Sequence, residues 1–182
     1  MKKINWLIIS IVATLFLNGC ASNNVRRFLP DPLHKTAIEK HLKKSITVDV
    51  SMTEGDQNSI MCRMVGNIYL PNKMTYSQYV EDAFKKVLVS ADRWSHEKIA
   101  DRTLAVVLTK VDFSSTSGEW YINANVKIGN NSPTIIKNTT KFGTSWIGEY
   151  ACKNAAESFE EAISNFVNEV LTNHNIIHKL GS

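Results

Sequence analysis

The chain has 182 residues, of which 43% are hydrophobic and 21% charged, and its formal net charge is +4 at pH 7. This composition is ordinary for a globular domain and excludes the disordered and collagen-like classes. The first 19 residues contain two lysines and no acidic residue, so the remaining chain has a formal charge of +2. A charge this close to neutral does not indicate nucleic-acid binding, and we expect no nucleic-acid partner.

The N-terminal residues have the three parts of an export signal. The chain begins with Met-Lys-Lys, and an apolar stretch of 14 residues follows over 4–17, with three polar interruptions. This stretch is too short to span a membrane comfortably, because a spanning helix needs about 20 residues. We therefore predict a signal peptide over residues 1–19.

The end of this segment, Leu17-Asn18-Gly19-Cys20, resembles the lipobox of bacterial lipoproteins. The resemblance implies cleavage before Cys20, a diacylglycerol on its thiol and acylation of the new N-terminus. Ala21 rather than Asp after the cysteine implies the outer membrane, on its periplasmic side or, as the alternative, at the cell surface. Several acyl chains, at about 0.8 kcal/mol per buried methylene, would hold the protein stably. An ordinary secretory signal with an incidental cysteine is the competing interpretation.

After Cys20, we predict a short tether over residues 20–31 and a single domain over 32–182. Asp31 followed by Pro32 is a typical helix start, with the acid as N-cap, and predicts a helix over 32–44. Residues 45–52 and 60–70 each alternate apolar and polar side chains, which predicts two half-buried strands. Because a turn-like segment joins them, we expect these two strands to form a hairpin.

The second half of the chain carries the strongest patterns. Thr75 and Gln78 resemble a capping box and predict a helix over 75–92. Further strands are predicted over 103–113, 119–128 and 134–142, the last as an edge strand rich in Lys and Thr. Apolar residues three or four apart predict a long amphipathic helix over 148–172.

This order of elements predicts an α+β fold. The economical arrangement is a two-layer sandwich with a mainly antiparallel sheet of about five strands. The two main helices would cover one face of the sheet, and the short N-terminal helix would be added to this core. Trp120 would lie on the inward face of its strand and pack in the core.

Two cysteines remain once Cys20 is acylated. An even pair in an oxidising compartment predicts one disulfide, between Cys62 and Cys152. Cys62 falls on the inward face of its predicted strand and Cys152 on the apolar stripe of its helix, which supports the same pairing. Two free buried thiols are the alternative.

Reactive constellations are scarce in the sequence. His174 and His178 have the spacing of a metal-binding pair on a helix, but no third ligand accompanies them, so we expect no metal and no cofactor. A nucleophile elbow and a glycine-rich phosphate loop are absent. The glutamates of the last helix lie opposite its apolar stripe and are typical of a solvated face: Glu157, Glu160 and Glu161. We predict that the protein is not an enzyme, and a cluster of acids or histidines in a cleft would reopen that question.

Six basic residues follow the anchor closely and are candidates for contact with an anionic membrane surface: Arg26, Arg27, Lys35, Lys40, Lys43 and Lys44. Each could add up to about 1 kcal/mol of attraction to an anionic leaflet. The alternative is a solvated face on a short helix.

The order of the predicted elements resembles that of two groups of envelope proteins. Behind the lipobox, this order is strand, helix, three strands and helix. It is similar to the auxiliary lipoproteins of ABC-type lipid transport systems and to the lipoprotein plug of the lipopolysaccharide-assembly machine, over about 110 residues. The stretches "CRMVGNIYLPNKMTYSQYVEDAF", "VDFSSTSGEWYI" and "FGTSWIGEYACKNAAESF" resemble uncharacterised proteobacterial lipoproteins. That group has no assigned activity, so the resemblance assigns no functional residue. The plug also begins with a Gly-Phe or Gly-Trp strand after its anchor, which is absent here.

These observations favour a non-catalytic accessory subunit that binds a protein partner in the envelope. Its partners would be the membrane, through acylated Cys20, and an envelope protein. Strand 134–142 and the polar face of the sheet are the expected docking surfaces. The alternative is a module that binds lipid or lipopolysaccharide between the sheet and the helices, in an apolar pocket.

Overall fold

The computed structural model describes residues 23–99 and 102–181. The predicted signal peptide and Cys20 lie outside these residues. The elements, in chain order, are α2 (Pro32–His41), β1 (Thr47–Met52), β2 (Ser59–Cys62), β3 (Gly66–Tyr69), the 3₁₀ turn η1 (Pro71–Lys73), α3 (Tyr76–Ser90), β4 (Thr103–Ser114), β5 (Glu119–Ile128), β6 (Thr134–Lys141), α4 (Gly148–Thr172) and α5 (His174–Gly181). No helix of the described part is both long and apolar enough to cross a membrane.

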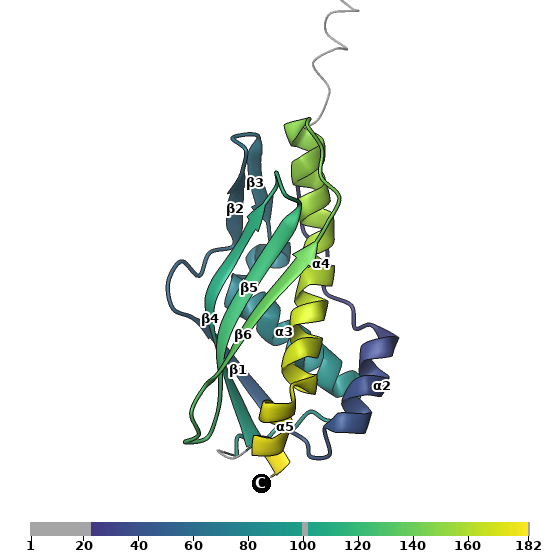
Figure 1. The fold of residues 1–182 in the computed structure, drawn as a ribbon, viewed down its shortest axis with the longest axis vertical. Coiled ribbons are helices and arrows are strands. Elements are labelled where there is room, and N and C mark those ends of the chain that lie inside the picture. The colour runs from purple at the N-terminus through teal and green to yellow at the C-terminus, as the bar shows by residue number, and fades with distance from the viewer. Residues whose placement is uncertain (1–22, 100–101, 182) are drawn as a thin grey trace, which may run out of the picture.

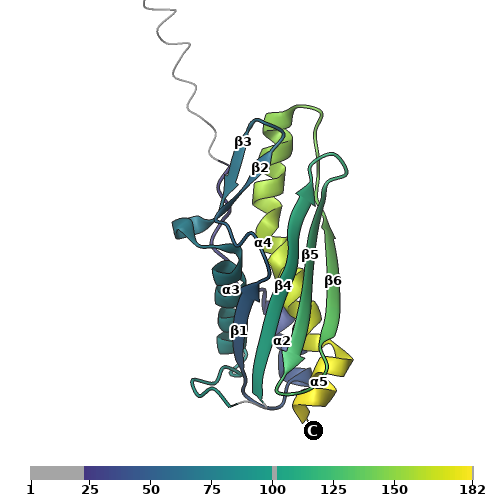
Figure 2. The same ribbon diagram turned by 90° about the vertical axis from the view of Figure 1, so that its left-hand side faces the viewer.

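Four strands form the main sheet, in the order β1-β4-β5-β6. β1 runs parallel to β4, whereas β4, β5 and β6 are antiparallel to their neighbours. Helices α3 and α4 lie on one side of this sheet (Figure 1 and Figure 2). The predicted α+β class is confirmed. The sheet is mixed and has four strands, with β2 and β3 forming a separate two-stranded sheet, instead of one mainly antiparallel sheet of about five.

The predicted hairpin between residues 45–52 and 60–70 is wrong. β1 pairs with β4, from Thr47 opposite Thr103 to Met52 opposite Leu108. Residues 59–69 fold back on themselves as the hairpin of β2 and β3. Alternation of side chains identifies a strand but not its partner. The segment 53–58, the expected hairpin turn, also lacks the Asn-Gly or Asp-Gly pair that is typical of short hairpins. The alternation over 60–70 places Met64 on the same inward face as Cys62, but Met64 lies in the turn and is 95% exposed.

The predicted helices agree closely with the structure because their caps are local features. Asp31 accepts a hydrogen bond from the Leu33 N–H at 2.8 Å and caps α2. Thr75 and Gln78 form both bonds of the capping box at the start of α3. The long helix α4 has the bounds predicted from its apolar stripe, 148–172.

The core lies between the sheet and the helices, and Trp120 of β5 is at its centre. Its side chain is 1% exposed, as predicted. The indole packs against Phe159 of α4, with ring centroids 4.6 Å apart, and against Phe113 of β4 at 4.8 Å. The indole N–H donates to the Ala155 carbonyl at 3.0 Å, so its polar atom is also satisfied.

The segment before α2 is part of the folded body from its first described residue. Asn23 O accepts from the Tyr69 N–H at 3.0 Å, and the Val25 N–H donates to Tyr69 O at 2.9 Å, so the segment lines the free edge of β3. Val25 is 4% exposed and Phe28 is fully buried. The predicted tether, 20–31, is therefore packed against the body from residue 23 onward, because Val25 and Phe28 enter the core.

Candidate functional site

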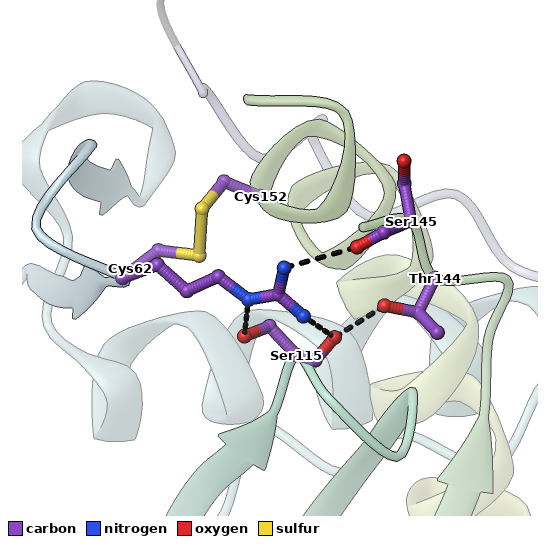
Figure 3. Close-up of a disulfide and its surroundings, with 6 residues drawn as sticks. Cys62, Ser115, Thr144, Ser145 and Cys152 are labelled. Atoms are coloured by element: carbon purple, nitrogen blue, oxygen red, sulfur yellow. Dashed lines mark hydrogen bonds between the residues drawn. A yellow bond between two sulfur atoms is a disulfide. The ribbon is translucent and has the colours of Figure 1, made fainter. Parts of the chain in front are cut away.

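A disulfide joins Cys62 at the end of β2 to Cys152 in the first turns of α4 (Figure 3). The sulfur atoms are 2.02 Å apart, the Cα atoms are 5.8 Å apart, and the sequence separation is 90 residues. These distances are normal for a disulfide, and the predicted pairing is confirmed. Both cysteines are buried, so the bond fastens the β2–β3 hairpin to the N-terminal end of the longest helix.

Arg63, the residue after Cys62, ties the turn of the same hairpin to two other loops. Its Nε donates to the Ser115 Oγ at 2.7 Å and its Nη2 to the Ser115 carbonyl at 2.5 Å. Its Nη1 donates to the Ser145 carbonyl at 2.9 Å, and the Thr144 hydroxyl also donates to Ser115 O (Figure 3). A guanidinium can hold several acceptors at once because its five donors are fixed in one plane. The sequence contained no signal for this role.

Six exposed apolar side chains lie on the two segments that Arg63 and the disulfide connect. We call them the tip surface: Met61, Met64, Val65, Trp146, Ile147 and Tyr150. Trp146 is 98% exposed and Met64 95% exposed. The two segments that supply these side chains are in contact. Gly148 lies so close to the Val65 side chain that a Cβ atom at this position would be only 2.9 Å from it. The hairpin and the start of α4 occupy the same end of the molecule in both views (Figure 1 and Figure 2).

A second cluster lies in a cleft of about 350 Å³ between the start of α2 and the middle of α4. Its lining includes the three glutamates predicted to form a solvated face, with five further residues: Leu29, Asp31, His34, Glu157, Glu160, Glu161, Ser164 and Asn165. The prediction missed this cleft because residues 29–34 cross over that face of α4. The His34 Nδ1 lies 3.0 Å from the Ser164 Oγ.

The cleft does not complete a nucleophile–base–acid triad in the described residues. A triad needs a third group that orients the base, whereas within the described residues the hydrogen bond of the His34 ring is the one to the Ser164 hydroxyl. Asp31 is occupied as the cap of α2, and Glu160 accepts the Leu29 N–H at 2.9 Å. These carboxylates therefore hold the N-terminal segment in place.

Beside this cleft, Tyr79 of α3 fixes the same segment. Its hydroxyl donates to the Arg26 carbonyl at 2.9 Å. Burial raises the pKa of the Tyr79 hydroxyl well above its usual range, and the nearby Glu160 and Asp82 carboxylates raise it further. The phenol therefore stays neutral and remains a donor.

Two further groups of residues are the candidates for metal binding and for membrane contact. Within residues 23–99 and 102–181, no group of three or more His, Cys, Asp and Glu side chains is placed to hold a metal ion. The rings of His174 and His178 stack 6.4 Å apart on α5.

The six basic residues predicted to contact a membrane lie in two different places. Arg26 and Arg27 lie beside α3 and η1, whereas the others belong to α2 and the loop after it: Lys35, Lys40, Lys43 and Lys44. Their contact with a membrane stays a prediction.

The outer face of the sheet, away from the helices, is mostly polar. Along β5 the side chains on this face are Glu119, Tyr121, Asn123, Asn125 and Lys127, while Trp120 and the even-numbered residues up to Ile128 are buried. On β6, Ile135 and Lys137 are exposed on the same face. The Phe142 N–H donates to Gly118 O, so the even-numbered residues of β6 are the ones hydrogen-bonded to β5. The backbone N–H and C=O groups of the odd-numbered residues therefore point away from β5: Ile135, Lys137, Thr139 and Lys141. β6 is thus an edge strand, as predicted.

Comparison with known proteins adds a likeness of fold. No protein-family model and no curated protein matches this sequence. Among solved structures, the chain is similar to protein XCC0632 from Xanthomonas campestris, described under the family DUF330. The match has a TM-score of 0.51 and 13% sequence identity, and covers 85% of this chain and 93% of that one. Because the identity is so low, what the match shows is that this chain and a bacterial DUF330 protein share a fold over most of their lengths.

Proposed function

We propose that the protein is a lipid-anchored lipoprotein of the bacterial envelope that acts as a non-catalytic, protein-binding accessory subunit. The observation that carries the proposal is that two of the three cysteines are paired with each other and the third stands apart near the N-terminus. Cys62 and Cys152 pair in a buried disulfide, as expected of a protein in an oxidising compartment. Cys20 stands in a stretch that resembles a lipobox, three residues before Asn23, which is hydrogen-bonded to β3.

The anchor is tested by the mass of the mature protein. The chain purified from its native membrane should begin at Cys20 and carry two ester-linked and one amide-linked acyl chain. Replacing Cys20→Ala should abolish incorporation of labelled palmitate, whereas Cys62→Ala should leave it unchanged, because Cys62 is in the disulfide. A mature chain with an unmodified Cys20 would contradict the anchor.

The outer sheet face and the β6 edge are the surfaces that support protein binding. They combine exposed backbone groups, which a partner strand can pair with, and a flat array of polar side chains. Lysines on an edge strand discourage nonspecific pairing between copies, so a partner would have to accommodate Lys137 and Lys141.

A photo-crosslinking residue placed in the native envelope tests this surface. At Lys137 or Lys127 it should yield adducts of defined mass, because both side chains are exposed on the sheet face. The matched control is Thr36, exposed on α2, which should yield none. Adducts absent from both sheet positions, or equal at all three, would refute the assigned surface.

The alternative is a lipid-binding module, which needs an apolar space between sheet and helices. That space is filled by fully buried side chains, among them Trp120, Phe84, Phe159 and Phe166. A cavity of about 430 Å³ beside β3 has a mixed lining that includes Asn24, Asn58, Asn72 and Lys73. Lipid binding would therefore require β5 and α4 to separate, and lipid that stays bound to the protein after detergent washing would support it.

A further inference from the structure

We propose that the tip surface sits in the headgroup region of the bilayer that holds the anchor, so that the molecule stands with α5 directed away from the membrane. This inference rests on the proposed function, because it takes Cys20 as acylated. The inference goes beyond the proposed function because it identifies the part of the body that contacts lipid. It thereby also fixes how the whole molecule is oriented on the membrane.

The first argument is the length of chain between the anchor and the fold. Asn24 forms a parallel bridge with Tyr69, so the chain enters beside the last residue of β3 from the side of the hairpin turn. From Gly66, next to the turn, to Tyr69 is about 10 Å at about 3.3 Å per residue. From Cys20 to Asn23 the chain can extend at most about 11 Å. The acylated residue can therefore reach the level of the turn but little farther.

The same length places the anchor far from the other end of the molecule. Helix α4 has 25 residues and is about 37 Å long at about 1.5 Å per residue. It runs from the hairpin end to α5, and α2 lies in the half nearer to α5 (Figure 1 and Figure 2). While Asn23 stays paired with β3, the three-residue link keeps the anchor near the hairpin end and away from α5 and the lysines of α2. Of the two ends of the molecule, the hairpin end is therefore the one that an upright molecule presents to the membrane.

The second argument is the chemistry of the tip surface. Trp and Tyr are enriched where proteins meet the headgroups, because their rings are apolar and each carries one polar group. Trp146 and Tyr150 are exposed here beside Met64, Val65 and Ile147. The segments 61–65 and 144–148 contain no acidic residue, and Glu149 is the acid that adjoins them. Elsewhere in the described chain the exposed apolar residues are mostly dispersed, such as Leu33, Val89 and Ile135.

The third argument is the way the tip is held. Arg63 and Met64 both have positive φ, 44° and 54°, a conformation that costs a non-glycine residue about 1–2 kcal/mol. The bonds of Arg63 to Ser115 and Ser145 and the neighbouring disulfide maintain this turn. The turn therefore holds the apolar side chain of Met64 out in the solvent. A rigid apolar tip inserts into an interface without losing conformational entropy on binding.

The test uses the mature, acylated protein in phosphatidylcholine vesicles whose acyl chains carry bromine, which quenches tryptophan on contact. Three tryptophans remain after cleavage, Trp94, Trp120 and Trp146. Relative to unbrominated vesicles, emission should fall by up to roughly one third, because one tryptophan in three lies at the interface. Trp146→Phe should abolish this loss, whereas Trp120 is buried and serves as the unquenched reference.

A matched pair of charge variants tests the tip without relying on Trp146 alone. Met64→Asp should reduce the quenching of Trp146 several-fold, since a carboxylate resists entry into the interface. Asp also tolerates positive φ, so the turn should persist. Leu33→Asp, at a side chain 78% exposed on α2, should leave quenching unchanged.

The outcomes separate the tip from the anchor. Equal quenching of the wild type and Trp146→Phe, with Cys20 acylated, would overturn the tip inference and leave the anchor standing. An unmodified Cys20 would overturn the proposed anchor and the inference with it. A stable dimer in light scattering that shields Trp146 from a soluble quencher would assign the tip surface to a second copy and would also overturn it.

Discussion

Replacing Cys62 and Cys152 together by alanine should lower the free energy of unfolding by about 4–5 kcal/mol. The disulfide spans 90 residues, and on the chain-entropy model a closed loop of that length removes this much free energy from the denatured state. Chemical denaturation of the double variant, compared with the wild type under non-reducing conditions, measures the difference. The double variant is preferred because a single replacement leaves a buried free thiol that can form wrong disulfides.

Reduction of the wild type provides the control for this experiment. It should reproduce most of the loss, because it breaks the same bond without changing side-chain volume appreciably. The hairpin of β2 and β3 should then exchange its amide hydrogens faster than the main sheet, since the disulfide is its covalent link to α4 and Arg63 remains to hold its turn. A loss below about 1 kcal/mol would mean that the other contacts of the hairpin make the disulfide redundant.

Trp120→Ala should cost about 3–5 kcal/mol of stability, the second of the two large effects. The indole is buried against Phe113 and Phe159, and its removal leaves a cavity at the centre of the core. It also removes the hydrogen bond to Ala155 O, a carbonyl to which the Ser158 hydroxyl also donates. Thermal and chemical unfolding of the purified variant should agree on the sign and approximate size.

Trp146→Ala is the matched control, since it deletes the same side chain at a position that is 98% exposed. Its stability in solution should stay within about 0.5 kcal/mol of the wild type. Comparable losses in both variants would contradict the assignment of Trp120 to the core and Trp146 to the surface.

Features encoded within one element were predictable from the sequence. The cap residues Asp31 and Thr75 mark helix starts because their side chains bond to backbone only two or three residues away. The 3.6-residue period of α4 likewise needs no knowledge of its partner. The disulfide could be predicted because both cysteines are in phase with buried faces, and two buried faces of one small domain meet in the same core.

Features that depend on contacts between distant segments were not predictable in this way. The parallel pairing of β1 with β4 joins residues more than fifty positions apart, and alternation within each strand does not encode it. The same limit hid the cleft, where Asp31 and His34 meet the glutamates of α4. It also hid the tip surface, whose two segments are brought together by the contacts of Arg63 and by the disulfide.

By itself, then, the sequence determined the α+β class, the helices α2, α3 and α4, the paired cysteines and the expectation of a lipid anchor at Cys20, because these depend on local patterns and on cysteine number. Only the tertiary structure decided that the chain is packed against β3 from Asn23 onward. It also decided which end of the molecule carries the exposed apolar residues. The physical reason is that the distance from an anchor to a surface depends on how far the chain is folded onto the body. That packing is produced by Val25 and Phe28 entering a core built by residues far along the chain.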